Sequence, residues 1–409
     1  MPALRIAYLV SRYPAISHTF ILREVIGLRQ YGIDIQVASI NPCDRPSGLL
    51  TEQEKSESAR TFYVKSAGIS GVVRTQWRTF VSTPRSYLRS LFFALALGGA
   101  DVRRIALSFF YFVEAVLIGD WMRAGGLHHL HVHFATPAAT VGMILTKLAP
   151  ITMSMTVHGP DEFYEVGAYY LTQKIETCKF VCAIGQFARS QLMKVSRVSE
   201  WHKLLISPLG VDTEQFPPRP LFLPPGTFEI LCIGRLTDAK GQHVLLEATA
   251  LLRSHGRAVR VRFVGDGPDR RSLEQQSSNL GLASDVTFEG AVNQDHIRAF
   301  YERAGVFALA SFAEGIPIVL MEAMSMEVPC VSTWITGIPE LIRNGIDGLL
   351  VAPGDAEALA SAIAELMDDA ELRRSLGVAG RLRVKDKFDL TRNLARLAGI
   401  FHQQLEANA

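Results

Sequence analysis

The sequence has few cysteines, and they follow no pattern. Only five of the 409 residues are cysteine, an odd number, and most lie within apolar runs. Cys178 and Cys182 form the only close pair, and no second pair completes the spacing of a zinc site. This usage predicts buried thiols in a reducing compartment rather than a disulfide framework.

An excess of charge of one sign and long apolar runs are also lacking. The 42 basic residues nearly balance the 40 acidic ones, and a net charge of +2 does not indicate a nucleic-acid-binding protein. No stretch reaches the roughly 18 uncharged apolar residues expected of a membrane span. The first ten residues contain Arg5 and predict a strand rather than a signal peptide. We therefore expect a cytoplasmic protein.

Two nucleotide-binding motifs are missing. The strand predicted over 4–10 is followed by Ser11-Arg-Tyr-Pro-Ala-Ile-Ser-His18, without the G-x-G-x-x-G of nicotinamide dehydrogenases. The loop Gly234-Arg-Leu-Thr-Asp-Ala-Lys-Gly241 is not a P-loop, because no serine or threonine follows its lysine. These absences exclude two common ways of binding a nucleotide.

The length and the 48% apolar content favour two domains rather than one core. Strands and helices alternate in both halves, which predicts an α/β fold of two doubly wound, Rossmann-like domains. We place the first domain at 1–208 and the second at 227–387. The linker at 209–226 holds five prolines between 213 and 226.

The stretch from Ser311 to Glu322 contains two carboxylates, Glu314 and Glu322, with seven residues between them. Pro317 suits the first turn of a helix, whose N-terminal N–H groups attract anions. Carboxylates accept hydrogen bonds from hydroxyl groups, so the pattern favours a ligand with hydroxyls on both sides of a diphosphate, as in a sugar nucleotide. The spacing alone also occurs by chance between two solvated acids.

Three further residues lie where a doubly wound sheet places its ligands. Arg235 and Lys240 stand in a predicted strand-to-helix turn, where two cations suit a diphosphate. His158 ends a predicted strand, at the sheet edge that binds ligands in open α/β sheets.

These segments resemble a known family. Glu314-X7-Glu322 resembles the signature of the retaining GT-B glycosyltransferases of family 4, nearest the bacterial exopolysaccharide and colanic-acid-type members. The other segments similar to the family are Gly234-Arg-Leu with Lys240-Gly241, His158-Gly-Pro-Asp-Glu-Phe163, Val328-Pro-Cys-Val-Ser-Thr333 and Asn344-Gly-Ile-Asp-Gly-Leu-Leu-Val-Ala-Pro353. Two departures are Glu327, where the family has glycine, and His18, which replaces a glutamate.

The resemblance implies a GT-B fold, with two domains facing a cleft and a C-terminal helix, 388–409, that packs back on the first domain. It implies catalytic roles for Arg235 and Lys240 on the diphosphate and for Glu314 and His158 on the transferred sugar. The donor-binding residues implied are Glu322 on the ribose, with Gly315, Ile316, Ile318, Val319 and Val292.

The expected activity is that of a retaining, metal-independent hexosyltransferase in exopolysaccharide synthesis. It would move a sugar from a nucleotide-diphosphate sugar to a glycan or lipid-linked saccharide, with no cofactor. The alternatives are a non-catalytic sugar-nucleotide or lipid-binding protein of this fold and a sugar-nucleotide epimerase. Donor base, sugar and acceptor stay open.

Two further patterns allow two interpretations each. Residues 65–104 hold seven cations against one acid, Asp101, among apolar residues at helical spacing. They predict either packed helices with a solvent-exposed cationic face or a surface for the anionic inner face of the plasma membrane.

His129, His131 and His133 alternate along a predicted strand and share one face. No further metal ligand is identifiable, so we expect packing or hydrogen bonding there and no metal.

Overall fold

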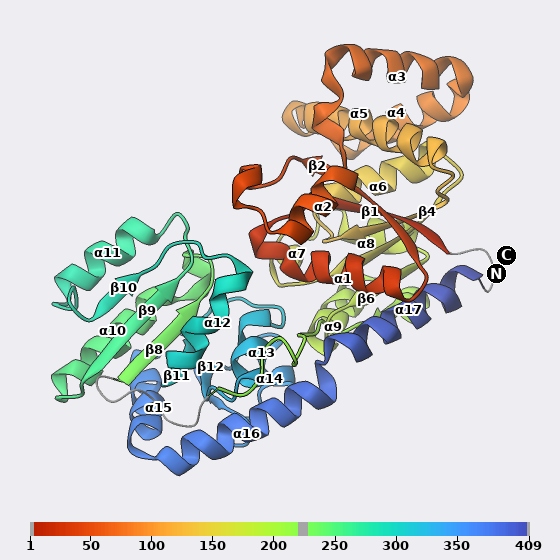
Figure 1. Cartoon of the computed structure of the whole chain (residues 1–409). Coiled ribbons are helices and arrows are strands. Elements are labelled where there is room, and N and C mark those ends of the chain that lie inside the picture. Colours follow the sequence, from red (N-terminus) through yellow and green to blue (C-terminus); the bar gives the residue numbers. More distant parts are fainter. Residues whose placement is uncertain (1–3, 220–227, 407–409) are drawn as a thin grey trace. The chain divides into compact units, whose positions relative to one another are not determined.

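The computed structural model describes residues 4–219 and 228–406, which divide into two compact units (Figure 1). Unit 1 comprises the chain up to Ile184, Ala188–Ser207 and the chain from Leu394; unit 2 comprises Gly185–Phe187 and Pro208–Asn393. The main boundary thus falls one residue before the predicted one, and the chain rejoins unit 1 at Leu394 rather than at 388. Residues 220–226 of the predicted linker lie outside the described residues.

Unit 1 is built on a parallel sheet of seven strands in the order β3-β2-β1-β4-β5-β6-β7. Its central strands are buried on both faces, as is usual for parallel sheets covered by helices, although β4 and β5 each carry polar side chains on one face. The order reverses between β1 and β4, which makes the carboxyl ends of these strands the switch point of the sheet. The strands are β1 (Arg5–Arg12), β2 (Asp34–Asn41), β3 (Phe62–Tyr63), β4 (His129–His133), β5 (Thr152–Val157), β6 (Phe180–Ala183) and β7 (Leu204–Ile206).

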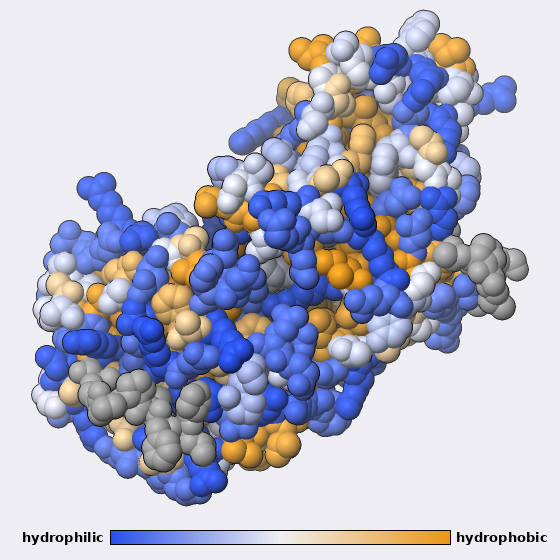
Figure 2. All heavy atoms as spheres, viewed as in Figure 1, coloured by the Kyte–Doolittle hydropathy of each residue, from blue (hydrophilic) through white to orange (hydrophobic). Residues whose placement is uncertain are grey.

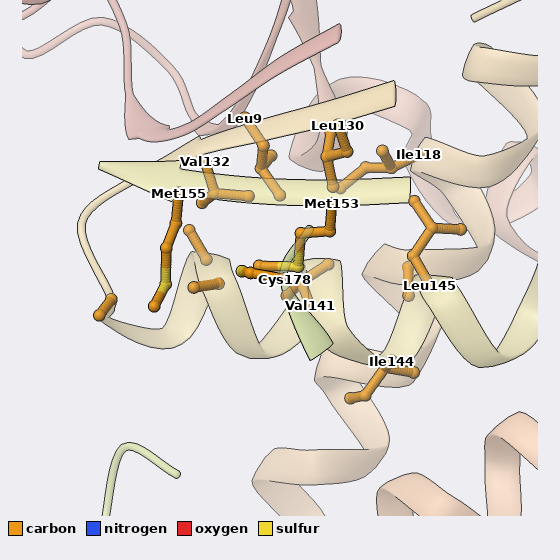
Figure 3. Packing of buried hydrophobic residues seen from close by; sticks show 14 of the residues in the cluster. Leu9, Ile118, Leu130, Val132, Val141, Ile144, Leu145, Met153, Met155 and Cys178 are labelled. Atoms are coloured by element: carbon orange, nitrogen blue, oxygen red, sulfur yellow. The ribbon is translucent and has the colours of Figure 1, made fainter. Parts of the chain in front are cut away.

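Helices cover both faces of this sheet. Figure 3 shows Leu130 of β4 and Met153 of β5 turned toward Val141 and Leu145 of α6, all fully or almost fully buried. The helices are α1 (Thr19–Gln30), α2 (Glu52–Arg60), α3 (Gly68–Ser82), α4 (Pro84–Leu97), α5 (Val102–Ala124), α6 (Pro137–Leu148), α7 (Asp161–Tyr164), α8 (Leu171–Thr177) and α9 (Gln186–Val195).

Helices α3, α4 and α5 form an insertion between β3 and β4. Helices α4 and α5 pack on α6, and α3 packs on α4 and α5. Contrary to our expectation for the sequence, α5 is long and apolar enough to cross a membrane by length and composition, with 39% of its apolar window buried. Its inner face, including Phe112 and Ile118, belongs to the core of unit 1, which accounts for its apolar length.

The last helix, α17 (Leu390–Glu406), packs on the sheet of unit 1. Phe401 is fully buried, with its ring centroid 5.1 Å from that of His131 and 5.8 Å from that of Phe180. Gly27 of α1 lies so close to Leu394 that an added Cβ would stand 2.3 Å from its Cδ1. The end of the chain therefore completes the first core.

Unit 2 holds a second parallel sheet, in the order β10-β9-β8-β11-β12-β13. Its switch point lies between β8 and β11. The strands are β8 (Phe228–Ile233), β9 (Val259–Val264), β10 (Val286–Phe288), β11 (Val306–Leu309), β12 (Cys330–Thr333) and β13 (Leu349–Val351). The helices are α10 (Gln242–Ser254), α11 (Arg270–Asn279), α12 (Gln294–Arg303), α13 (Ile318–Ser325), α14 (Ile338–Leu341), α15 (Ala356–Asp368) and α16 (Ala370–Lys387). Two Rossmann-like units, as predicted, are thus confirmed.

Candidate functional site

The site in unit 2 forms where the loops after β8 and β11 meet. These strands are neighbours at the switch point, so the loops that follow them leave the sheet side by side. Phe312 N donates to Ala239 O at 2.9 Å, which ties the loop after β11 to the loop after β8. The two loops carry three of the four charged residues that the sequence placed at a diphosphate or sugar, namely Arg235, Lys240 and Glu314; the fourth, Glu322, lies in α13.

Gly241 lets the two loops approach. It ends the short 3-10 turn Asp238–Lys240 with φ +60°, a left-handed conformation that favours glycine. A Cβ at Gly241 would stand 2.1 Å from Ala310 O, so the close approach also requires the missing side chain. Gly241 is also the N-cap of α10, so Lys240 lies two residues before the first residue of that helix.

Lys240 and Glu314 form an ion pair across the switch point. Lys240 Nζ lies 2.5 Å from Glu314 Oε1, which also accepts a hydrogen bond from Ser311 Oγ at 2.8 Å. The Lys240 side chain is 25% exposed and that of Glu314 only 8%, so a ligand reaches the ammonium more readily than the carboxylate. The structure thus brings together two residues that lie 74 positions apart in the chain.

Arg235 belongs to the same loop as Lys240 and follows β8 directly after Gly234. Its side chain is exposed, and no carboxylate among the described residues pairs with it. Its carbonyl oxygen accepts from Gln242 Nε2 at 2.9 Å, which fixes the backbone of the loop but leaves the guanidinium available. The loop after β8 therefore offers an anion an exposed guanidinium group in addition to the ammonium group of Lys240.

Glu322 lies inside α13, where two side chains engage it. Only 2% exposed, it accepts from Gln294 Nε2 at 2.9 Å and from Tyr301 OH at 3.0 Å. Both partners belong to α12, and neither was predicted from the sequence. Pro317 is the N-cap of α13 and not, as expected, part of its first turn.

The other predicted donor-binding residues lie in the loop that carries Glu314, in the first turn of α13 and in the loop before α12. A Cβ added to Gly337 would stand 2.2 Å from Gly315 O, so the two backbones can approach only because residue 337 is glycine. Thr336 Oγ1 donates a hydrogen bond to Glu314 O. These contacts fix the turn that presents Glu314. Ile316 is buried before α13, Ile318 and Val319 open that helix half-buried, and Val292 is half-buried in the loop before α12.

Glu327 adopts the conformation for which the family's glycine is suited. Its φ is +59°, in the left-handed region that costs a side chain strain. Its carbonyl oxygen lies 2.4 Å from where a Cβ on Gly377 would stand, so α16 packs closely on this turn. The departure affects the turn after α13 and makes no contact with Glu314 or Glu322 in the described chain.

In unit 1, His158 follows β5, next to the switch point of that sheet. Its Nε2 lies 3.0 Å from His133 Nδ1, and the other His133 nitrogen lies 3.2 Å from Glu24 Oε1. Burial, and then the nearby His133 and His18, lower the pKa of His158 well below its usual value, so the ring is neutral at pH 7. Its Nδ1 is buried with no hydrogen-bond partner among the described residues.

A carboxylate that sequence reasoning missed positions His158. Glu162 accepts from the backbone N–H groups of His158 at 2.6 Å and Gly159 at 2.9 Å, and from that of Ala135. Burial raises the pKa of Glu162 to about 7, while these donors and Lys174 oppose the rise. Glu162, the second residue of α7, was visible in the His158–Phe163 segment, but its backbone partner Ala135 in the loop after β4 was not.

The histidines of β4 approach one another and an acid. Glu24, His131 and His133 offer ligand atoms within 4.8 Å of one another, so the structure supplies the further ligand that was not identifiable in the sequence. Both ring nitrogens of His131 are already engaged, however, by Ser154 Oγ at 2.7 Å and Thr156 Oγ1 at 2.9 Å. A metal ion would have to break one of these bonds, so the arrangement suits a hydrogen-bonded core better than a metal site.

Comparison with known proteins finds a family match in the second half of the chain and relatives over nearly its whole length. The family described as "Glycosyl transferases group 1" matches residues 215–383. The chain is 27% identical over 407 residues to the "Putative colanic acid biosynthesis glycosyltransferase WcaL" of Escherichia coli K12, covering 96% of this chain and 97% of that one. It is 24% identical over 404 residues to the "Amylovoran biosynthesis glycosyltransferase AmsK" of Erwinia amylovora, covering 94% and 96%.

Solved structures share the fold. Sucrose-phosphate synthase from Thermosynechococcus elongatus superposes with a TM-score of 0.77 at 20% identity, over 99% of this chain and 100% of that one. HepE of Anabaena, solved in complex with UDP-glucose, superposes with a TM-score of 0.74 at 16% identity, over 98% and 100%. The chain therefore has the GT-B fold, its residues 215–383 match the model of the group 1 glycosyl transferases, and it is similar over nearly its whole length to proteins named as glycosyltransferases of colanic acid and amylovoran biosynthesis.

Proposed function

We propose that the chain is a retaining glycosyltransferase that moves a sugar from a nucleotide-diphosphate sugar to a glycan or lipid-linked saccharide in exopolysaccharide synthesis. The observation that carries this proposal is the Lys240–Glu314 ion pair at the switch point of unit 2, with Arg235 exposed in the same loop as Lys240. Cations and a carboxylate in one loop pair suit a ligand with a diphosphate and sugar hydroxyls. The names of the two relatives described above point to the same class of reaction.

In the proposed reaction the bond between the anomeric carbon and the diphosphate oxygen breaks. Lys240 and Arg235 stabilise the charge that develops on the leaving diphosphate, which is usually the largest catalytic effect. An acceptor hydroxyl attacks the anomeric carbon on the face that the diphosphate leaves, and its proton passes to a leaving phosphate oxygen. The new bond therefore keeps the anomeric configuration.

The remaining residues bind the donor. Glu314 accepts hydrogen bonds from hydroxyl groups of the transferred sugar once Lys240 leaves it to bind the diphosphate. Glu322 accepts hydrogen bonds from the hydroxyl groups of the ribose. The unpartnered Nδ1 of His158 is the proposed contact of unit 1 with a sugar. No step needs a metal ion, so we expect activity to persist in the presence of a chelator.

The experiment is a screen of radiolabelled UDP-, GDP- and dTDP-sugars with a bacterial lipid extract as acceptor. Transfer of label to lipid or glycan, or slow release of free sugar to water, supports the proposal. Conversion of the donor into its epimer would instead favour the epimerase, and binding without turnover a non-catalytic protein. Binding is measured separately by thermal stabilisation, which rises with ligand concentration for any ligand that prefers the folded chain.

A further inference from the structure

Helix α3 carries an exposed apolar stripe along its whole length. Its members are four residues apart and therefore share one face of the helix. Each of them is at least 60% exposed, although residues of these types are usually buried. The opposite face is the packed one: Thr79 is buried, and Gln76 Nε2 donates to Val113 O of α5 at 3.2 Å. The α3 stripe consists of Ile69, Val73, Trp77 and Val81.

The apolar surface continues onto the neighbouring helices. Phe92 on α4 is 66% exposed, and Val102 and Phe110 on α5 are 79% and 62% exposed. Figure 2 shows hydrophobic residues among hydrophilic ones over these helices, at the top of the view. Large exposed apolar patches rimmed by polar residues mark interaction or membrane surfaces.

Arginines without acidic partners accompany this surface. Arg74, Arg85 and Arg103 are exposed, and no carboxylate among the described residues pairs with them. Other arginines are neutralised within the insertion, since Arg78 pairs with Asp120, and Arg104 lies 3.5 Å from Asp101. Three unpaired guanidinium groups thus stand on helices that also expose a tryptophan and a phenylalanine.

The charge and the apolar side chains of this face indicate which kind of partner it binds. A second copy of the same face would bring guanidinium groups against each other without an acid to separate them. An anionic leaflet supplies the opposite charge, and its interface accepts tryptophan and other apolar side chains at the depth of the headgroups. The docking is peripheral, because Phe112, Ala115 and Ile118 on the inner face of α5 are part of the core of unit 1.

We propose that α3, α4 and the first turns of α5 dock unit 1 onto an anionic lipid bilayer, with the α3 stripe inserted in the interface. The inference goes beyond glycosyl transfer and does not depend on it. Each arginine near an anionic leaflet contributes about fivefold in partitioning, equivalent to about 1 kcal/mol. The stripe adds the transfer of apolar surface out of water.

Co-sedimentation of the full chain with vesicles tests the proposal. Vesicles of phosphatidylcholine with phosphatidylglycerol should bind the chain, and binding should weaken as ionic strength rises and the screening length falls from roughly 10 Å to 3 Å. Pure phosphatidylcholine should bind it poorly. Two variants separate the contributions: V73S/W77S/V81S removes apolar side chains, and R74Q/R85Q/R103Q removes charge. Each should weaken binding about tenfold or more.

The matched control is V198S/I346S/L382S, which removes three apolar side chains with comparable exposure outside the insertion. It should bind like the wild type, and unchanged thermal unfolding should show that all variants are folded. In a second measurement, brominated lipids should quench tryptophan fluorescence in the wild type and in W334F, but much less in W77F. The proposal is overturned if the wild type ignores anionic vesicles at low salt, or if the stripe variant and the control bind equally.

Discussion

Lys240 and Glu314 neutralise each other at the switch point of unit 2, so a diphosphate that binds Lys240 competes with an internal carboxylate. The pair also keeps Glu314, which is 7% exposed, from being an uncompensated buried charge. Binding of the donor would therefore exchange one ion pair for another, and would free Glu314 for hydroxyl groups at the same time.

The first prediction concerns Glu314→Gln. We expect UDP or GDP to bind this variant about fivefold more tightly, equivalent to roughly 1 kcal/mol, because Lys240 loses its competitor. We expect kcat to fall nonetheless, since the carboxylate is the proposed partner of the reacting sugar. Titration calorimetry measures the first effect and steady-state transfer the second. Asp368→Asn, which breaks the Arg257 pair away from the switch point, serves as control. Weaker diphosphate binding with unchanged kcat would refute the proposal that Lys240 exchanges Glu314 for the diphosphate.

At this scale the sequence indicated individual residues better than their partners. The cations and both glutamates were predicted through their loops and through the resemblance. The Lys240–Glu314 contact was not, because it depends on which strands are neighbours in the sheet. Tyr301 and Gln294 were missed as partners of Glu322, since an amphipathic helix such as α12 gives no sign of which residue meets a buried acid.

At the scale of elements, the site depends on how closely the loop after β8 approaches the loop after β11. The strands and helices followed from apolar runs and turn residues, so the doubly wound pattern of both units was predictable. The close approach was not, because it requires a glycine that meets a carbonyl 69 residues away in the chain.

We predict that Gly241→Ala destabilises unit 2 by roughly 2 kcal/mol or more, through left-handed strain and the clash with Ala310 O. Gly256→Ala is a matched control: its φ is +75°, but a Cβ there meets nothing within 4 Å. The free energy of unfolding in urea is measured for both variants. Both include the left-handed strain, so the difference between them gives the cost of the clash. Nucleotide affinity should fall in Gly241→Ala alone, because this loop carries Lys240. Equal losses in the two variants would show that the approach of the loops contributes nothing.

At the scale of the whole molecule, unit 1 buries neutral histidines in its core. Burial lowers the pKa of His18 to about 4 and that of His129 to about 3, and moves those of His131 and His158 well below their usual values. The unfolded chain therefore binds more protons than the folded one below a pH of about 6.5. Burial raises the pKa values of Glu114 and Glu162 to about 7, so these two carboxyl groups bind protons more readily in the folded chain. They offset only part of the effect of the four histidines.

We accordingly predict that unit 1 loses stability as the pH falls from about 6.5 toward 4, by up to about 1.4 kcal/mol per pH unit for each histidine kept neutral. His131→Asn should reduce the slope, and His255→Asn, an exposed position in unit 2, should leave it unchanged. Hydrogen exchange of β4 and β5 as a function of pH follows unit 1 selectively. A pH-independent exchange rate after correction for intrinsic chemistry would contradict the account.

The two-unit architecture was predictable because alternating strands and helices repeat twice. The exposed face of the α3–α5 insertion was not, since helical spacing alone does not say which of two apolar faces is packed. The structure resolves that ambiguity: Thr79 lies on the packed face of α3, whereas Trp77 is 68% exposed.

The central claim is that the turn carrying Lys240 binds the diphosphate of a sugar nucleotide during transfer. Its most direct test is the rate of sugar transfer by Lys240→Met, which removes the charge and shortens the side chain by one atom. We predict a loss of about 10²- to 10³-fold in kcat/KM, the cost of removing one charge-stabilising donor, with thermal unfolding close to that of the wild type. Transfer at the wild-type rate by a folded Lys240→Met chain would contradict the claim.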